Sequence, residues 1–171
     1  MKASIYISSE MIKVLLFTKI GHRITVKDYL THPLPEECVL NGVILDNAPI
    51  IEKLRLLKSS QSGVLKEVSL VIDGSFVYTK KITVPGKLSK IMCDEVIRDE
   101  FSEISTDAEN LICDHFKLSS NDDGSIDILA CAVESAHAQA YLDIFKAADI
   151  KLSNVNIGIL AVLSLSIKCS S

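Results

Sequence analysis

The sequence predicts a mixed α/β (α+β) chain in which a small second lobe is inserted into a first. Three observations predict this arrangement. An apolar hairpin and a further strand open the chain, a helix and a β-branched strand follow, and a block with the order β-α-β-β-α precedes a last strand and helix. We therefore expect one lobe from residues 1–76 plus 151–171 and an inserted lobe from residues 77–150.

Apolar residues at alternate positions predict the opening strands. Residues 4–7 form the first strand and residues 12–17 the second, with Ser8-Ser9-Glu10 between them as a tight polar turn. A third strand covers residues 22–30, and the prolines within residues 33–36 exclude regular structure there. These strands form the opening sheet of the first lobe.

A turn and a helix follow the opening sheet. Asn41-Gly42 is a typical turn pair, and residues 50–60 carry apolar side chains at helical spacing. Asp46 or Asn47 can cap this helix, and its first turn tolerates Pro49. The helix therefore provides the crossover from the opening sheet to the next strand.

That next strand, residues 68–72, is rich in β-branched side chains, which predicts burial on both of its faces beside the opening sheet. Asp73-Gly74-Ser75 follows it directly. Polar residues at the end of a buried strand can form a ligand site, but a tight bend at the junction between the lobes is the simpler interpretation.

The inserted block begins with a strand over residues 76–84. Ser89 can cap the helix after it, and helical spacing predicts an inward face formed by Ile91, Met92, Val96, Phe101 and Ile104. Two alternating strands, residues 111–118 and 126–133, are joined by an acidic turn that suits a hairpin tip better than a calcium loop. A helix over residues 135–148 completes the block.

Composition excludes several classes of function. The net charge is −4 and the lysines are spread along the chain, so we expect no binding to nucleic acid. The end of the sequence is apolar. It is predicted to form a strand over residues 152–157 and a helix over residues 159–168. The longest apolar run, residues 157–167, is shorter than the ~20 residues that cross a bilayer. We therefore expect no direct membrane insertion.

The residues of catalytic and metal sites are sparse. The five cysteines are odd in number and lack close pairs, which predicts reduced and mostly buried thiols. Only Cys113 and His115 are close enough in sequence to share a metal, and no further ligand is near them. His137 has no serine or cysteine partner in sequence. We expect no metal site and no catalytic residue.

Several stretches in order resemble the bacterial actin-like proteins of the PilM/FtsA group, and PilM of type IV pilus machines in particular. Residues 4–14 stand where PilM has a strand, an Asp-x-Gly-Ser/Thr turn and a second strand with a lysine. The further stretches that carry the resemblance are Pro33-Leu34-Pro35, Asn41-Gly42-Val43-Ile44-Leu45-Asp46, Ile82-Thr83-Val84-Pro85 before Leu88-Ser89, Ala147-Ala148-Asp149-Ile150 and Asn154-Val155-Asn156. The resemblance implies an actin-like (ribonuclease H-like) first lobe that carries the inserted lobe.

In actin-like ATPases the first turn holds phosphate and Mg²⁺ through small residues and an Asp. Here Tyr6 stands at the Asp position and Ser8 at the Gly position. Ser8, Ser9 and Lys13 then form only a vestigial phosphate turn, and Glu10 would repel an anion beside it. The family's second lobe, which completes the nucleotide site, would lie beyond residue 171. We expect no cofactor and no enzymatic activity, with ATP and Mg²⁺ conceivable only where a second lobe is present.

The resemblance implies a non-catalytic scaffold in the cytoplasm, peripheral to the inner face of the plasma membrane. Its partner would be the cytoplasmic tail of a PilN-like inner-membrane protein, docked as an extended peptide in a groove between the lobes. The residues we expect to bind it are Val77, Tyr78, Thr79 and Lys80, with Ile82 behind them. The alternative is a fragment of an actin-like ATP-binding protein, either an ATPase or kinase or an FtsA-like cell-division protein. We also expect self-association through apolar surface of the last helix.

Overall fold

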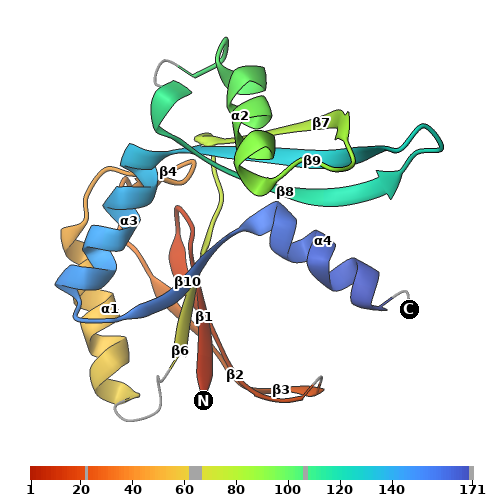
Figure 1. Cartoon of the computed structure of the whole chain (residues 1–171). Coiled ribbons are helices and arrows are strands. Elements are labelled where there is room, and N and C mark those ends of the chain that lie inside the picture. Colours follow the sequence, from red (N-terminus) through yellow and green to blue (C-terminus); the bar gives the residue numbers. More distant parts are fainter. Residues whose placement is uncertain (22, 62–66, 106–107, 170–171) are drawn as a thin grey trace. The chain divides into compact units, whose positions relative to one another are not determined.

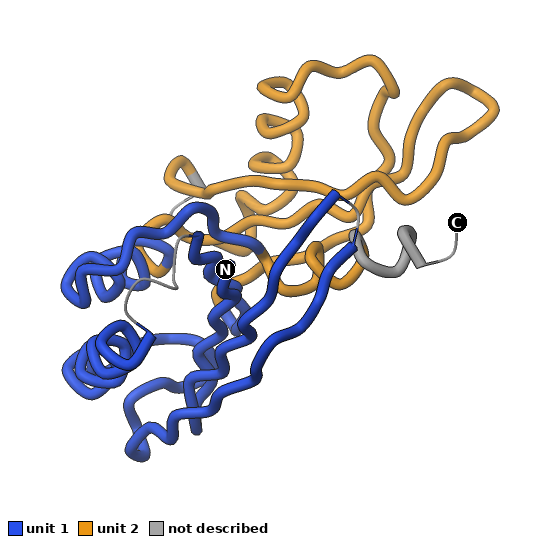
Figure 2. Tube along the Cα trace, turned by 90° about the horizontal axis from the view of Figure 1, so that it is seen from below, with its two compact units in different colours: residues 1–75, 138–156 blue, residues 76–137, 157–171 orange. Residues whose placement is uncertain are grey.

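The computed structural model describes residues 1–21, 23–61, 67–105 and 108–169, and it divides into two compact units. Unit 1 contains residues 1–75 and 138–156, and unit 2 contains residues 76–137 and 157–171 (Figure 2). The predicted lobes were defined by the order of elements along the chain, whereas the two units are defined by which residues contact one another. The predicted lobe boundaries therefore stay a prediction.

Unit 1 is built on a five-stranded sheet with the order β10-β6-β1-β2-β3 (Figure 1). Its strands are β1 (Lys2–Ile7), β2 (Met11–Ile20), β3 (Arg23–Pro33), β6 (Glu67–Ile72) and β10 (Leu152–Ile157). The β1–β2 and β2–β3 pairs are antiparallel, and β1 and β6 are parallel. The carboxyl ends of β1 and β6 consequently meet at one edge of the sheet.

Two helices cover one face of this sheet. Figure 1 shows α1 (Ala48–Ser60) and α3 (Ser135–Ala147) on the same side of it. The side chains that form the core of unit 1 alternate along the strands and recur at helical spacing: Ala3, Ile5, Ile7, Ile12, Val14, Leu16, Ile50, Leu54, Leu57, Val68, Leu70, Ile72, Tyr141, Ile144 and Phe145. Burying each large aliphatic side chain contributes roughly 1.5–3 kcal/mol.

Two details of unit 1, the end of β3 and the burial of β6, differ from the sequence predictions, whereas the predicted turn at Asn41-Gly42 is confirmed. β3 continues to Pro33 because it is an outer strand, where a proline removes no ladder donor. β6 is fully buried on one face only, since Ser69 and Val71 are half-exposed. Asn41-Gly42 is the tip of a small hairpin between β4 (Val39–Leu40) and β5 (Val43–Ile44), and both tip residues have positive φ.

Unit 2 is a three-stranded antiparallel sheet with the order β7-β9-β8. Its strands are β7 (Val77–Pro85), β8 (Leu111–Ser120) and β9 (Ser125–Glu134). Helix α2 (Lys90–Phe101) packs on β8 and β9, and α4 (Gly158–Cys169) lies beside β8. A short 3₁₀ turn, η1 (Ala108–Asn110), precedes β8. In the described residues no helix combines the length and the apolar character that crossing a membrane requires.

The inward face predicted for α2 is confirmed for Phe101, which is buried, and for Val96, which packs against the core, but it is wrong for Ile91, Met92 and Ile104. Cys93, Ile97 and Phe101 are the buried residues of α2, whereas Ile91 is 73% exposed and Ile104 is 59% exposed. The buried residues are four apart and form one stripe, with Cys93 acting as a small apolar residue. The predicted cap is confirmed, because the Ser89 hydroxyl accepts a hydrogen bond from the Met92 N–H at 3.3 Å.

Candidate functional site

The first candidate site is a cavity of about 540 Å³ at the carboxyl ends of β1 and β6. It brings together the turn after β1, the Asp73-Gly74-Ser75 bend after β6 and the tip of the β4–β5 hairpin. Its lining residues are Tyr6, Ile7, Ser8, Ser9, Glu10, Lys13, Asn41, Gly42, Asp73, Gly74 and Ser75. All of them belong to unit 1.

The turn between β1 and β2 is closed by its own hydrogen bonds. The Ser8 N–H donates to the Met11 carbonyl at 3.0 Å, and the Ser8 hydroxyl donates to the same oxygen at 2.9 Å. The Met11 N–H in turn lies 3.2 Å from the Ser8 hydroxyl oxygen, which accepts it. The hydroxyl that could contact a phosphate therefore stabilises the turn itself.

The opposite wall of the cavity depends on a glycine. Gly74 has a φ of +145°, and a Cβ placed on it would lie 2.3 Å from the Asn41 carbonyl oxygen. The Ser75 N–H donates to that same oxygen at 2.9 Å. The Tyr141 hydroxyl on α3 donates to the Gly42 carbonyl at 2.6 Å. These contacts fix the Asn41-Gly42 tip against the bend after β6.

The charges around the cavity do not favour an anion. The charged residues that line the cavity are Lys13, Glu10 and Asp73, which gives two carboxylates and one ammonium group. The Lys13 Nζ lies 5.8 Å from the centre of the Tyr6 ring, and the Gly74 N–H donates to Asp73 Oδ1 at 2.9 Å. Burial, and then the charge of Asp73, raise the pKa of Tyr6, which keeps its hydroxyl protonated.

These residues do not fit a nucleotide phosphate. The Ser8 hydroxyl and one oxygen of Asp73 are engaged in local hydrogen bonds. The carboxylates of Glu10 and Asp73 would also repel phosphate oxygens. That Ser8, Ser9 and Lys13 are the remnant of a phosphate turn stays a prediction.

The second candidate site is the free edge of β7. β7 is an outer strand of its sheet and pairs with β9 in one unbroken register from Val77 to Pro85. The outer strands β3 and β8 instead shift register, which leaves Lys27 and Leu118 without partners in their ladders. Bulges of this kind hinder edge-to-edge pairing. The regular edge of β7 is therefore a better template for an added strand than the edges of β3 and β8.

The predicted binding residues lie along this strand on alternating sides. Tyr78, Lys80 and Ile82 face α2: the Tyr78 ring is 6.0 Å from the Phe101 ring, Lys80 forms a 2.7 Å ion pair with Glu100, and Ile82 is a core residue. Thr79, in contrast, is exposed and points to the other face.

A polar cluster fixes the start of β7. The Tyr78 hydroxyl donates to Glu134 Oε1 at 2.7 Å, and this hydrogen bond is the main cause that raises the pKa of Tyr78. His137 Nε2 lies 3.3 Å from the other carboxylate oxygen of Glu134, and its ring stacks on Phe76 at 4.9 Å. The first residues of β7 are thus held in a defined orientation.

The remaining polar candidates have structural roles. Cys38, Cys93, Cys113 and Cys131 are free thiols whose pKa values burial raises, so they are poor nucleophiles. Within the described ranges no group of three metal-ligating side chains occurs. In the acidic turn, Asp123 Oδ1 accepts hydrogen bonds from the Ser125 N–H and hydroxyl. That pairing closes the hairpin tip.

Sequence reasoning did not connect Asp73-Gly74-Ser75 with the first turn. It interpreted this bend as a junction between lobes, whereas the bend lines the same cavity as Ser8 and Ser9. The signal that could have found it was the strand order, because two parallel neighbouring strands end at the same edge of a sheet.

Comparison with known proteins identifies the fold and the family. Among solved structures, the chain is similar to one described as a PilM-PilN type IV pilus biogenesis complex, with a TM-score of 0.76 at 15% identity over 91% of this chain and 47% of that one. It is also similar to the cytoplasmic domain of EpsL, an inner-membrane component of the type II secretion system of Vibrio cholerae. That match has a TM-score of 0.55 at 13% identity and covers 91% of this chain and 56% of that one.

A third structure, from Bacteroides thetaiotaomicron and described as having an actin-like ATPase fold and unknown function, matches with a TM-score of 0.46 at 12% identity. This match covers 98% of the present chain and 56% of the Bacteroides chain. A search of curated protein sequences finds no significant match. The chain thus spans about half the length of the solved structures that it matches.

The predicted fold class is confirmed: the chain has a mixed α/β fold that the first two structures share, with an antiparallel three-stranded sheet besides the larger five-stranded one. The family match extends over residues 4–169, nearly the whole chain, and the family is described as type IV pilus assembly protein PilM. This range includes every stretch that carried the resemblance, from residue 4 to Asn156. The chain belongs to the PilM family of type IV pilus assembly proteins.

Proposed function

We propose that this chain is a cytoplasmic scaffold module of a type IV pilus assembly complex, and that it binds an extended peptide along the free edge of β7. The peptide would come from the cytoplasmic tail of a PilN-like inner-membrane protein. Binding that tail would hold the chain at the inner face of the membrane without any segment of its own in the bilayer. The proposal assigns the chain no catalytic step.

The observation that carries the proposal is the unbroken edge of β7. An added strand needs a row of unpaired backbone groups in regular geometry. β7 offers nine residues in one register, whereas the outer strands β3 and β8 are interrupted by bulges. The solved relative described as a PilM-PilN complex supports a PilN-like protein as the source of the peptide.

The side chains of β7 would provide selectivity. Tyr78 and Lys80 lie on the side of α2, held by Glu134 and Glu100 respectively. Val77 and Thr79 lie on the other face. Alternate side chains of an added strand would contact these two rows in turn. Ile82 would act from behind, as a core residue that keeps the strand in place.

Backbone methylation of the peptide tests this mode of binding. Two versions of a fluorescently labelled PilN-like tail peptide are synthesised, one N-methylated at even positions and the other at odd positions. Only one set of alternate N–H groups can face β7 in an added strand. We expect one version to lose affinity at least about tenfold and the other to bind like the unmodified peptide.

Strand addition would be contradicted if both methylated peptides lost affinity equally, or if neither peptide lost affinity. A Thr79→Glu variant supplies the matching change in the protein, since this side chain is exposed and has no core role. The control is Thr25→Glu on the bulged edge of β3, where an exposed threonine receives the same charge. Thr79→Glu should weaken or strengthen peptide binding, and Thr25→Glu should leave it within about twofold.

A further inference from the structure

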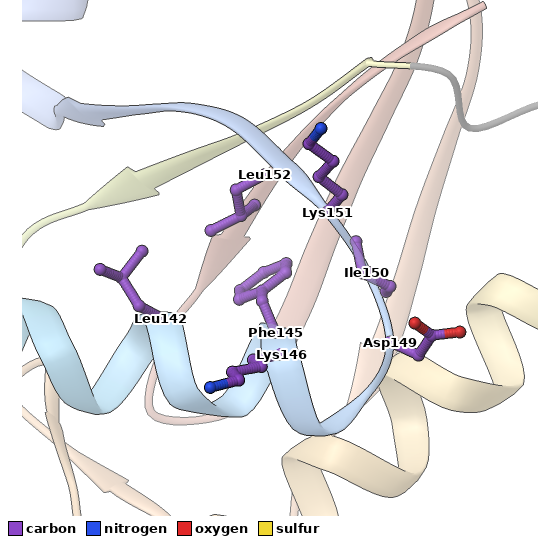
Figure 3. Close-up of a pocket in the computed structure, with 7 residues that line it drawn as sticks. All are labelled: Leu142, Phe145, Lys146, Asp149, Ile150, Lys151 and Leu152. Atoms are coloured by element: carbon purple, nitrogen blue, oxygen red, sulfur yellow. The ribbon is translucent and has the colours of Figure 1, made fainter.

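A second cavity in unit 1, of about 400 Å³, lies where α3 turns into β10. Figure 3 shows the Phe145 ring in the middle of the lining residues, with Leu142 and Leu152 to one side of it and with Lys146 and Lys151 below and above it. The volume lies within the ~300–1,000 Å³ range of ligand pockets. We call this cavity the α3–β10 pocket. Its volume gives room for one large apolar side chain and the backbone next to it.

The floor of the pocket is formed before any ligand binds. Asp149 has a φ of +54°, and its N–H donates to the Lys146 carbonyl at 3.0 Å. The Ile150 N–H donates to the Phe145 carbonyl at 2.9 Å. This pair of bonds is a Schellman motif, and its usual apolar contact is supplied by Phe145 and Ile150, which are 1% and 7% exposed.

Helix α1 holds the same turn from the other side. Arg55 Nη2 donates to the Ala147 carbonyl at 2.8 Å, and Lys58 Nζ donates to the Asp149 carbonyl at 2.6 Å. Lys58 also forms an ion pair with the Asp149 carboxylate, which lowers the pKa of that carboxyl. A pocket fixed by two helices requires little ordering when a ligand enters.

The charges at the rim are unbalanced. The carboxylate of Asp149 is neutralised by Lys58. Lys146 and Lys151 are both exposed, and neither forms an ion pair with any residue in the part of the chain that the structure describes. The rim thus carries two uncompensated positive charges, although the whole chain has a net charge of −4. An apolar floor between two cations is complementary to an apolar group flanked by anions.

We propose that the α3–β10 pocket binds an acidic peptide segment of a partner protein through one large apolar side chain. The apolar side chain lies on Phe145 and Ile150, and Leu142 and Leu152 contact its sides. Carboxylates on either side of the anchor pair with Lys146 and Lys151. The pocket and the β7 edge share no residue, so the proposal adds a second partner segment and does not rest on the proposed function.

Fluorescence anisotropy with a defined probe tests the proposal. The probe is a labelled synthetic peptide, Asp-Glu-Leu-Phe-Glu-Asp, titrated at low salt against the whole chain. One comparison peptide replaces Leu-Phe by Ser-Ser, and a second replaces all four acids by lysine. We expect saturable binding of the probe, loss of at least about tenfold for the Ser-Ser peptide, and no binding of the basic peptide.

Variants of the chain locate the binding. The double variant Lys146→Glu/Lys151→Glu should weaken binding of the probe at least about tenfold. The charge-matched control is Lys19→Glu/Lys27→Glu, at exposed positions of β2 and β3, and it should change affinity by no more than about twofold. Leu142→Ser removes apolar contact without altering charge and should also weaken binding.

Three outcomes would overturn the proposal. The first is the absence of saturable binding of the probe at ~1 mM, and the second is an equal loss of affinity in the two double variants. The third is a dimer in light scattering that Lys146→Glu/Lys151→Glu dissociates, because that would assign the pocket to a second copy of the chain. Circular dichroism should give the same unfolding midpoint for every variant, so that loss of binding is not loss of fold.

Discussion

Replacing Gly74 by alanine tests how the bend after β6 supports the β4–β5 hairpin. A Cβ on Gly74 would lie 2.3 Å from the Asn41 carbonyl oxygen and 2.8 Å from the Gly42 Cα. These are backbone atoms, so they cannot rotate away. The φ of +145° adds roughly 1–3 kcal/mol of strain for a residue with a side chain, and displacing the hairpin adds a similar amount. We expect Gly74→Ala to lower the free energy of unfolding by about 4 kcal/mol.

Urea unfolding followed by circular dichroism measures this loss. The matched control is Gly21→Ala, because Gly21 also has positive φ (+58°) but no atom within 4 Å of its Cβ position. The control isolates the backbone strain and should cost about 1–2 kcal/mol. If Gly74→Ala costs no more than Gly21→Ala, the close approach of the two loops is not rigid and the description of the cavity wall is wrong.

Three further predictions concern the same two units. Tyr141→Phe leaves the half-buried Gly42 carbonyl without its 2.6 Å donor, so urea unfolding should show a loss of about 1 kcal/mol. The absence of any loss would mean that water replaces the hydroxyl. Hydrogen bonds from Lys81 and two neighbours lower the pKa of Asp127 from 3.8 to about 2. The stability that the Asp127 carboxylate contributes is therefore complete above about pH 4 and is lost as the pH falls through 2. We expect the urea midpoint of Asp127→Asn to change less between pH 4 and pH 2 than the midpoint of the unchanged chain. The same pH dependence for both proteins would contradict the pairing. Addition of Mg-ATP should leave the melting temperature unchanged, whereas a saturable rise would refute the interpretation of the turn at Ser8.

Much of unit 1 could be predicted from the sequence. Its strands alternate apolar and polar residues in a regular way, and Ile5, Ile7, Ile12 and Val14 all lie on the buried face. The Ser8 turn followed from the short polar gap between two such strands. Local patterns of this kind depend on residues close in sequence, and they therefore survive without knowledge of the fold.

The orientation of α2 could not be predicted in the same way. Ile91 and Met92 are apolar, yet they are 73% and 51% exposed, because the helix turns Cys93 toward the sheet instead. A cysteine in a helix is a weak indicator of the buried face, and the first turn of α2 contains several apolar residues that could equally mark that face. The sheet under the helix decides between them, and that sheet is formed by residues far along the chain.

Both candidate pockets also depend on contacts between distant residues. The cavity at the Ser8 turn requires the parallel pairing of β1 with β6, which places Asp73 beside that turn. The α3–β10 pocket requires Asp149 in a left-handed conformation, where glycine is the usual sequence signal. An aspartate that pairs with Lys58 gives no such signal.

Residue-resolved hydrogen exchange of β7 tests the proposed function most directly. Amide exchange is measured by NMR with and without the PilN-like tail peptide. Strand addition predicts that alternate amides between Val77 and Pro85 exchange at least about tenfold more slowly in the complex, while those of the outer edge of β3 keep their rates. Saturating peptide that leaves the β7 amides unprotected would contradict the account.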